Sequence, residues 1–195
     1  MEDKPLPRSE RQNEALRRAS RERILAHALR LFAEHGYERT TIKMLAESAG
    51  ISQGLIYRHF ESKGALLQAI FDQSMADVRA SFGAAEAGQP GARIEGLIRA
   101  SFQVLRRNQQ FWRLSYGVRM QAAVLATLGA QTKVWMDEIR RTLERYLRDD
   151  GVAQPELEAV ILFALIDGVS QHYVLDPGHY PLDRIAERIV AAYRR

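Results

Sequence analysis

The sequence predicts an all-α protein, and two observations carry that prediction. Apolar residues recur at intervals of three and four nearly everywhere along the 195 residues, which is the spacing of one helix face. No stretch shows the sustained alternation or the β-branched enrichment that is typical of strands. We expect about nine helices, arranged as an N-terminal three-helix unit with a helix-turn-helix, followed by a larger helical domain.

The composition excludes several classes of protein. Cysteine is absent, which excludes a disulfide framework, a thiolate zinc site and a cysteine nucleophile. The net charge of +4 gives a mild preference for polyanions. The longest apolar run, residues 159–166, is far below the roughly 20 residues that cross a bilayer. Because the charged N-terminus also lacks the apolar segment of a secretory signal, we expect a cytoplasmic protein without a membrane span.

The first helix is expected from Ser20 to His35. Serine caps the free N–H groups at a helix start, and Gly36 is a natural residue just past a helix end. The apolar residues that share one face of this helix are Ile24, Ala28, Leu31 and Phe32. Residues 1–19 are highly charged with a basic excess, and we interpret them as a disordered tail.

Two short helices joined by a tight glycine turn come next. Thr41 can cap the first helix, and Gly50 ends it. Ser52 can cap the second helix, which is about two turns long. The residues expected to hold this unit together are Ile42, Leu45, Ala46, Ala49, Ile56 and Phe60. The pair has the organisation of a helix-turn-helix.

A long fourth helix is expected from Ser62 to about Gly83. Its apolar positions are Leu66, Leu67, Ile70, Phe71, Met75 and Val78. Residues 83–91 contain three glycines and Pro90, so we expect a loop there. Further helical patterns cover 92–108, 110–123, 127–149, 155–175 and 181–194.

One dipeptide resists the helical pattern of residues 155–175. Asp167-Gly168 favours a turn, but the helical spacing continues through it, with Val160, Ala164 and Gly168 on one face. We therefore expect one continuous helix. A glycine within it lets a partner helix approach closely, at about 1 kcal/mol of helix propensity relative to alanine.

The helix-turn-helix carries side chains suited to DNA. Its second helix lies in the major groove and presents N-terminal residues to base edges. The amide of Gln53 can pair with adenine, Tyr57 offers its ring to a thymine methyl group, and Gly54 lets the backbone come close. The candidates for phosphate contacts are Thr40, Thr41, His59 and Lys63. The basic tail has a second interpretation, as a minor-groove arm.

Residues 40–67, TTIKMLAESAGISQGLIYRHFESKGALL, resemble the DNA-binding signature of the tetracycline-repressor (TetR) family of bacterial transcription regulators. The matching features are the double threonine Thr40-Thr41, the turn from Ala46 to Gly50, the segment Tyr57-Arg58-His59-Phe60 and the pair Ser62-Lys63. The resemblance is strong over about residues 20–70. Beyond them it is one of length and all-helical layout.

The resemblance implies a role for each matched position. It places Lys43, Gln53, Gly54 and Tyr57 nearest the bases, and Thr41, Ser52, His59 and Lys63 on phosphates. Members with a bulkier residue at position 54 make a contact there that this chain lacks, so the operator sequence cannot be inferred. The resemblance also implies a homodimer on a palindromic double-stranded operator. It further implies a C-terminal domain that binds a small molecule and thereby changes the spacing between the DNA-binding domains of the two subunits.

The resulting domain organisation is a tail over 1–19, a DNA-binding domain over 20–66 and a ligand-binding and dimerisation domain over 67–195. The candidate ligand-pocket residues are Phe102, Trp112, Tyr116, Met120, Trp135, Phe163 and Asp167. Aromatic and methionine side chains suit an apolar pocket as well as an ordinary core, and Asp167, Arg113 and Arg119 are candidate polar anchors, with a surface or capping charge as the alternative for each. The candidate dimer-interface residues are Leu157, Val160, Ile161, Ala164, Gly168, Ile185 and Ile189, where an intramolecular core is the alternative.

The sequence gives no support to an enzyme. It contains no phosphate-binding glycine loop, no HExxH and no Gly-x-Ser-x-Gly. His172, Asp176 and His179 lie close in sequence, but a turn separates them and we predict no metal site and no cofactor. We expect a ligand-responsive transcription regulator, most simply a repressor released by a small apolar or amphipathic effector. The alternative is a helical protein-interaction or apolar-ligand carrier module that does not bind DNA.

Overall fold

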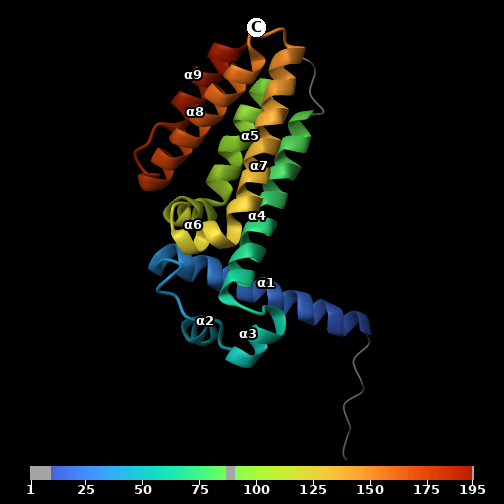
Figure 1. The fold of residues 1–195 in the computed structure, drawn as a ribbon, viewed down its shortest axis with the longest axis vertical. Helices are drawn as coiled ribbons and strands as arrows, with labels where there is room; N and C mark the ends of the chain where they lie inside the picture. The colour runs from blue at the N-terminus through green and yellow to red at the C-terminus, as the bar shows by residue number, and fades with distance from the viewer. Residues whose placement is uncertain (1–9, 87–90, 195) are drawn as a thin grey trace, which may run out of the picture. The chain divides into compact units, whose positions relative to one another are not determined.

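A computed structural model describes residues 10–86 and 91–194 and confirms the all-α prediction (Figure 1). These two ranges form nine helices and contain no strand. The helices are α1 (Glu10–His35), α2 (Ile42–Ala49), α3 (Gln53–His59), α4 (Lys63–Glu86), α5 (Arg93–Arg107), α6 (Gln109–Val118), α7 (Ala122–Asp149), α8 (Pro155–Leu175) and α9 (Leu182–Tyr193). The chain divides into two compact units, Met1–Ile70 and Phe71–Arg195, and the division falls within α4.

The first unit packs α1, α2, α3 and the first two turns of α4 around one apolar core. The predicted stripe of α1 is buried, and the ring of Phe32 meets Tyr37 edge to face at 5.2 Å. The buried residues that α2, α3 and α4 add are Leu45, Ala46, Ala49, Ile56, Leu66, Leu67 and Ile70. The spacing of apolar residues therefore predicted this core correctly, except that Ile42 is only half-buried.

The first helix begins ten residues earlier than predicted, at Glu10 rather than at Ser20. Residues 10–19 contain no proline or glycine and consist largely of good helix formers, so nothing ends the helix there. Ser20 is consequently a mid-helix residue whose buried hydroxyl oxygen has no hydrogen-bond partner among the described residues. The predicted disordered tail is thus wrong for residues 10–19, and residues 1–9 lie outside the described ranges.

A glycine closes the turn between α2 and α3. Gly50 has φ of 62° and donates its N–H to the carbonyl of Glu47 at 3.2 Å, while Ile51 donates to Ala46 at 3.0 Å. This pair of bonds is a Schellman motif, which satisfies the last carbonyl groups of a helix and requires a left-handed residue. The tight turn expected from the sequence is therefore a backbone requirement at position 50.

Thr40 and Lys63 brace the segment between α1 and α2, which corrects both predictions for these residues. The Thr40 hydroxyl is buried and donates to the carbonyls of Gly36 at 2.8 Å and Leu31 at 3.3 Å. Thr40 therefore serves the fold, and no phosphate can reach its hydroxyl.

The ammonium group of Lys63 reaches back from the first residue of α4. Its Nζ donates to the carbonyls of Tyr37, Glu38 and Thr40 at 2.9, 3.2 and 3.2 Å. It also lies 4.4 Å from the centre of the Tyr37 ring, a cation–π distance. Three hydrogen bonds use all the donors of an ammonium group, so Lys63 is a structural brace instead of the free phosphate ligand that we predicted.

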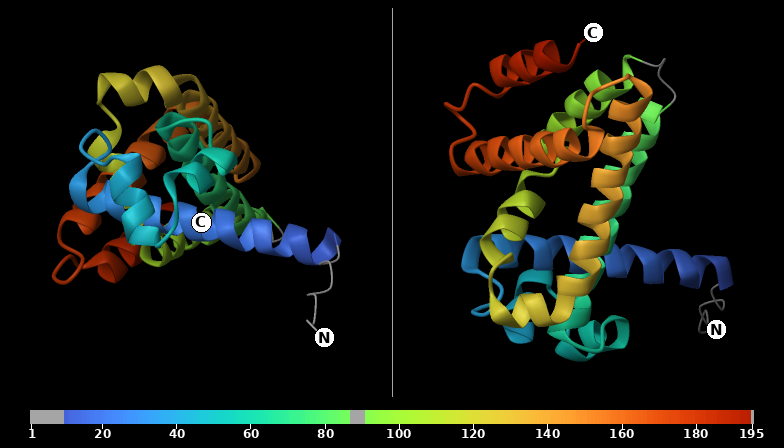
Figure 2. Two further views of the ribbon diagram at one scale, coloured as in Figure 1. Left: turned by 90° about the horizontal axis from the view of Figure 1, so that it is seen from below. Right: turned by 45° about the horizontal axis from the view of Figure 1, so that its top comes forward.

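The second unit consists of α5 to α9 and the rest of α4. Its α7 lies against α8, and its α5 lies against α9. Helices α4 and α7 run side by side within this unit (Figure 2), where Arg79 pairs with Glu138 at 2.7 Å and Phe71 stacks on Trp135 at 6.0 Å. Helix α8 continues through Gly168 without interruption, as predicted.

Several boundaries differ from the predicted ones. Helix α4 runs past Gly83 to Glu86, because a glycine in a helix costs stability but does not end it. Helix α6 ends at Val118, and α7 already begins at Ala122 instead of at residue 127. The three residues between them form the turn that separates the two helices.

Helix α8 has the length and composition of a membrane-spanning helix, with a mean hydropathy of 1.3 in an 18-residue window. The sequence prediction of no membrane span considered only uninterrupted apolar runs, which miss this helix. One third of the window is buried within the structure, and the core helix of a globular domain meets the same criteria. The apolarity of α8 on both faces is the feature that needs an explanation.

Replacing Gly50 should separate backbone strain from helix propensity. Gly50→Ala places a side chain in the left-handed region and should lower the free energy of unfolding by about 1 kcal/mol. Gly54→Ala is the matched control, because it lies in α3 with ordinary φ and only the Ser52 Oγ, at 3.9 Å, near the added carbon. It should stabilise the protein by roughly 0.5 kcal/mol. Urea titrations followed by circular dichroism measure both, and equal effects of the two substitutions would contradict this account of the turn.

Removing the Lys63 ammonium should lower the free energy of unfolding, in addition to removing a charge. Lys63→Ala leaves the carbonyls of Tyr37, Glu38 and Thr40 without their donor and should lower the free energy of unfolding by about 2 kcal/mol. Lys43→Ala removes an exposed ammonium from α2 and should change it by less than about 0.5 kcal/mol. Thermal melting of both variants tests this difference, and a Lys63→Ala variant as stable as the wild type would disprove the brace.

Candidate nucleic-acid interface and effector cavity

Capping side chains fix the two helices of the helix-turn-helix. The Thr41 Oγ1 accepts the N–H of Met44, and the Ser52 Oγ accepts the N–H of Leu55, both at 3.2 Å. Both residues are exposed. Since a hydroxyl that accepts one hydrogen bond still has its own O–H to donate, capping and phosphate binding are compatible at both positions.

Helix α3 has one buried and one open face. Ile56 is fully buried, whereas Tyr57, the next residue, is 52% exposed. Gln53 and Gly54 lie one turn before Tyr57 and are exposed as well. The structure therefore brings together the three residues of α3 that we predicted to face the bases, and Lys43 is exposed on α2.

Basic residues gather at the C-terminal end of α3. Burial lowers the pKa of the His59 imidazole, and the charges of Arg17, Arg21 and Arg58 lower it further. The Arg21 guanidinium also lies 5.1 Å from the centre of the Phe60 ring. A neutral His59 retains one N–H that can donate to a phosphate. The sequence reasoning missed this cluster because it assigned Arg17 to a disordered tail; the spacing of Arg17 and Arg21 by one helical turn was the available signal.

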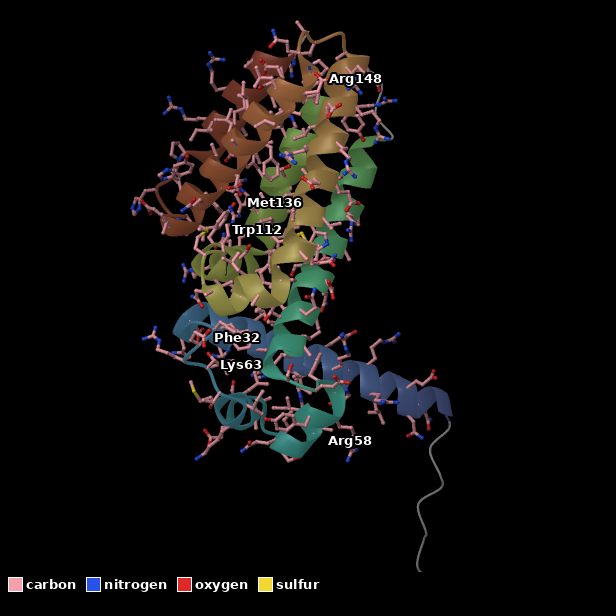
Figure 3. All side chains as sticks on the ribbon, in the orientation of Figure 1. Phe32, Arg58, Lys63, Trp112, Met136 and Arg148 are labelled. Atoms are coloured by element: carbon pink, nitrogen blue, oxygen red, sulfur yellow. The ribbon has the colours of Figure 1, made fainter. Side chains whose placement is uncertain are left out.

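The second unit contains a partly open cavity of about 470 Å³ between α4, α5, α6, α7 and α8. Its wall is mainly apolar, and the labelled side chains Trp112 of α6 and Met136 of α7 both contribute to it (Figure 3). The predicted pocket residues that border it are Trp112, Tyr116, Met120, Trp135, Phe163 and Asp167. Phe102 does not border it, because it points into the packed core of the unit and is 4% exposed. That prediction was wrong.

One wall of the cavity carries an ion pair between Arg119 and Asp167. The Arg119 guanidinium donates to both carboxylate oxygens of Asp167, from Nη1 at 2.8 Å and from Nη2 at 3.1 Å. The Tyr116 hydroxyl donates to the Asp167 Oδ1 at 3.2 Å, and the Arg119 guanidinium lies 4.6 Å from the centre of the Tyr116 ring. Burial together with the Asp167 charge raises the pKa of Tyr116, so its hydroxyl stays protonated. Asp167 therefore lies where we expected a polar anchor.

An apolar stripe lies open along α8. Leu157, Val160 and Ile161 are each about half exposed, and Ala164 and Leu165 continue the stripe. Two predicted interface residues of α9 behave differently, since Ile189 is 5% exposed and Ile185 is half-buried against the core. The intramolecular alternative holds for Ile189, because the apolar face of the amphipathic α9 packs inward.

Known protein families match residues in both units of the chain. The family model of bacterial regulatory proteins of the tetR family matches residues 24–70, and the C-terminal model of BetI-type transcriptional repressors matches residues 90–194. The uncharacterised HTH-type transcriptional regulator YhgD of Bacillus subtilis is 26% identical over 83% of this chain and 86% of its own length. YerO of the same organism is 51% identical over 24% of this chain, which covers only 16% of YerO.

Solved structures agree on the fold. The transcriptional regulator FadR from Bacillus subtilis, determined in complex with stearoyl-CoA, superposes with a TM-score of 0.74 at 16% identity, over 89% of this chain and 97% of that chain. The two family models together account for the helix-turn-helix and for most of the second unit. The chain belongs to the TetR family of DNA-binding transcriptional regulators.

Proposed function

We propose that this regulator represses transcription by binding a palindromic operator as a homodimer, in the cytoplasm, and leaves the operator when a small apolar or amphipathic effector fills the cavity. The observation that carries the proposal is the open face of α3. Gln53, Gly54 and Tyr57 share that face while Ile56, beneath them, is fully buried. A recognition helix in the major groove needs this division between a packed face and a bare one.

The apolar stripe of α8 supports a homodimer. A row of half-exposed leucine, valine and isoleucine side chains is unfavourable in water, and it gains stability when a second copy covers it. The stripe has few charges, so two copies related by a two-fold axis can pair it with itself. Dimerisation would give the two reading helices that a palindrome requires.

The cavity and α4 support regulation by a ligand. Helix α4 begins at the Lys63 brace of the helix-turn-helix and continues into the second unit, where Phe71, Met75 and Val78 border the cavity. A ligand that binds the DNA-incompetent arrangement more tightly shifts the population toward it, by about 1.4 kcal/mol for each tenfold change in ratio. The match to the BetI-type repressor model supports repression as the output.

The direct test is sequence-specific DNA binding. An operator is first selected from a random duplex library and then titrated with wild-type protein at several salt concentrations. Specific binding should exceed binding to a scrambled duplex by at least about a thousandfold, whereas a carrier module without a DNA role should bind neither duplex. Repeating the selection with DNA that flanks the coding sequence tests whether the protein controls its own gene.

Truncating the reading side chains should weaken specific binding. Gln53→Ala and Tyr57→Ala should each cost about 1–3 kcal/mol of operator binding and relax the preference at one half-site position, because each removes a base contact. Gln131→Ala, an exposed glutamine of α7, is the matched control and should bind as the wild type does. Fluorescence anisotropy at fixed salt gives the affinities. Unchanged affinity in both α3 variants would rule out this reading face.

A charge on the α8 stripe should dissociate the dimer. Ile161→Glu places a carboxylate at the centre of the stripe, where pairing would bury it without a partner. Val134→Glu is the matched control, because Val134 is also exposed, at 57%, but lies on α7. Light scattering should give a monomer for Ile161→Glu and a dimer for wild type and control. A dimer of Ile161→Glu would place the interface elsewhere.

A further inference from the structure

In the charged wall of the cavity, Asp167 and the Tyr116 ring form a site suited to a cation, and the Arg119 guanidinium fills it. The Arg119 guanidinium rests on the face of the Tyr116 ring at 4.6 Å, and its two terminal nitrogens bind the Asp167 carboxylate at 2.8 and 3.1 Å. An aromatic face beside a carboxylate is an arrangement that binds organic cations. Here the chain's own guanidinium occupies it.

The two partners differ in how easily they can leave. The two side chains are similarly exposed, at 34% for Arg119 and 27% for Asp167. Arg119, however, has a long, flexible side chain and follows the last residue of α6, so its guanidinium can swing from the turn into water. Asp167 has a short side chain and lies in the middle of α8. The carboxylate therefore stays in the cavity wall whether or not Arg119 is bound to it.

This asymmetry decides which charge a ligand should carry. An organic cation can take the place of Arg119 on Asp167 and Tyr116, and the displaced guanidinium regains its hydration. An anion that captured Arg119 would leave the Asp167 carboxylate unpaired in the same wall, next to a second negative charge. Lys133 and Arg140 also border the cavity, and Arg140 is paired with Asp137, so an anion has alternative partners there and must be tested explicitly.

We propose that Asp167 and the Tyr116 ring form a cation subsite that Arg119 occupies in the free protein, and that the effector is an apolar organic cation that displaces Arg119. The mainly apolar remainder of the cavity takes the rest of such a molecule. The proposal rests on the proposed function, because it assigns a ligand class to the effector cavity. It makes Arg119 an internal competitor of the effector.

The test compares three probes with one chain and different head groups: decyltrimethylammonium, decanoate and 1-decanol, each below its aggregation concentration. The chain has two tryptophans, Trp112 and Trp135, and both border the cavity, so intrinsic fluorescence reports binding there. Wild-type protein should bind the cation about tenfold more tightly than the alcohol or the carboxylate. Circular dichroism checks that each variant used below is folded.

The two variants of the ion pair should change the affinity for decyltrimethylammonium in opposite directions. Arg119→Ala should bind decyltrimethylammonium more tightly, by about fivefold or more, because the internal competitor is gone. Asp167→Asn should bind it about tenfold more weakly and lose the preference over 1-decanol. Arg113→Ala removes an exposed guanidinium of α6 that does not border the cavity; it is the control and should bind the cation as the wild type does.

Two outcomes would overturn the inference, and they differ in whether the effector part of the proposed function fails as well. Tighter binding of decanoate, weakened by Arg119→Ala or by Lys133→Ala, would make the site an anion site and leave the effector cavity in place. If none of the three probes changes the fluorescence or the melting temperature, the cavity is not an amphipath site, and the effector part of the proposed function fails as well.

Discussion

Three backbone carbonyl groups between α1 and α2 accept hydrogen bonds from a single ammonium group, that of Lys63. This brace joins the start of α4 to the segment that leads into the helix-turn-helix. The Thr40 hydroxyl, in the same segment, shares its one proton between the carbonyls of Gly36 at 2.8 Å and Leu31 at 3.3 Å. Because the carbonyls of Tyr37, Glu38 and Thr40 receive this donor from the first residue of α4, the segment that leads into α2 depends on the first turn of α4.

The same helix connects the two activities that we propose. Its first residue holds the helix-turn-helix, and its later turns supply Phe71, Met75 and Val78 to the cavity. A packed helix responds as a unit, so a ligand that favours another packing of these side chains also acts on the helix that carries the brace. Coupling between the sites then needs no additional element.

Helix α8 meets two demands that explain its unusual apolarity. Its inner side contributes Leu162 to the core and Asp167 to the cavity wall, while its outer side carries the stripe around Val160 and Ile161. A helix that is apolar on both sides needs a partner on each. The proposed effector subsite and the proposed dimer surface therefore lie on one helix, about two turns apart along the chain.

The sequence predicted the features that local rules determine. Threonine and serine caps, the glycine at position 50 and the spacing of apolar residues placed α2 and α3 correctly, and left Gln53 and Tyr57 as the side chains without a core role. These features depend on neighbours within one or two turns, so a single sequence contains them.

The failures come from contacts between distant residues. Lys63 and Thr40 look like phosphate ligands until their carbonyl partners, up to 26 residues away, are known. Apolar periodicity predicts that Phe102 and Ile189 are buried, but it does not say whether a buried side chain meets a void, a partner chain or the core. The pairing of Arg119 with Asp167 spans 48 residues and left no local signal.

The central claim is that occupation of the cavity weakens operator binding. The most direct measurement titrates a fluorescent operator with wild-type protein while decyltrimethylammonium is increased, and follows tryptophan fluorescence in the same samples. The account predicts that operator affinity falls by about tenfold or more, that its midpoint coincides with the fluorescence midpoint, and that operator DNA weakens cation binding by the same factor. Saturated fluorescence with unchanged operator affinity would contradict it.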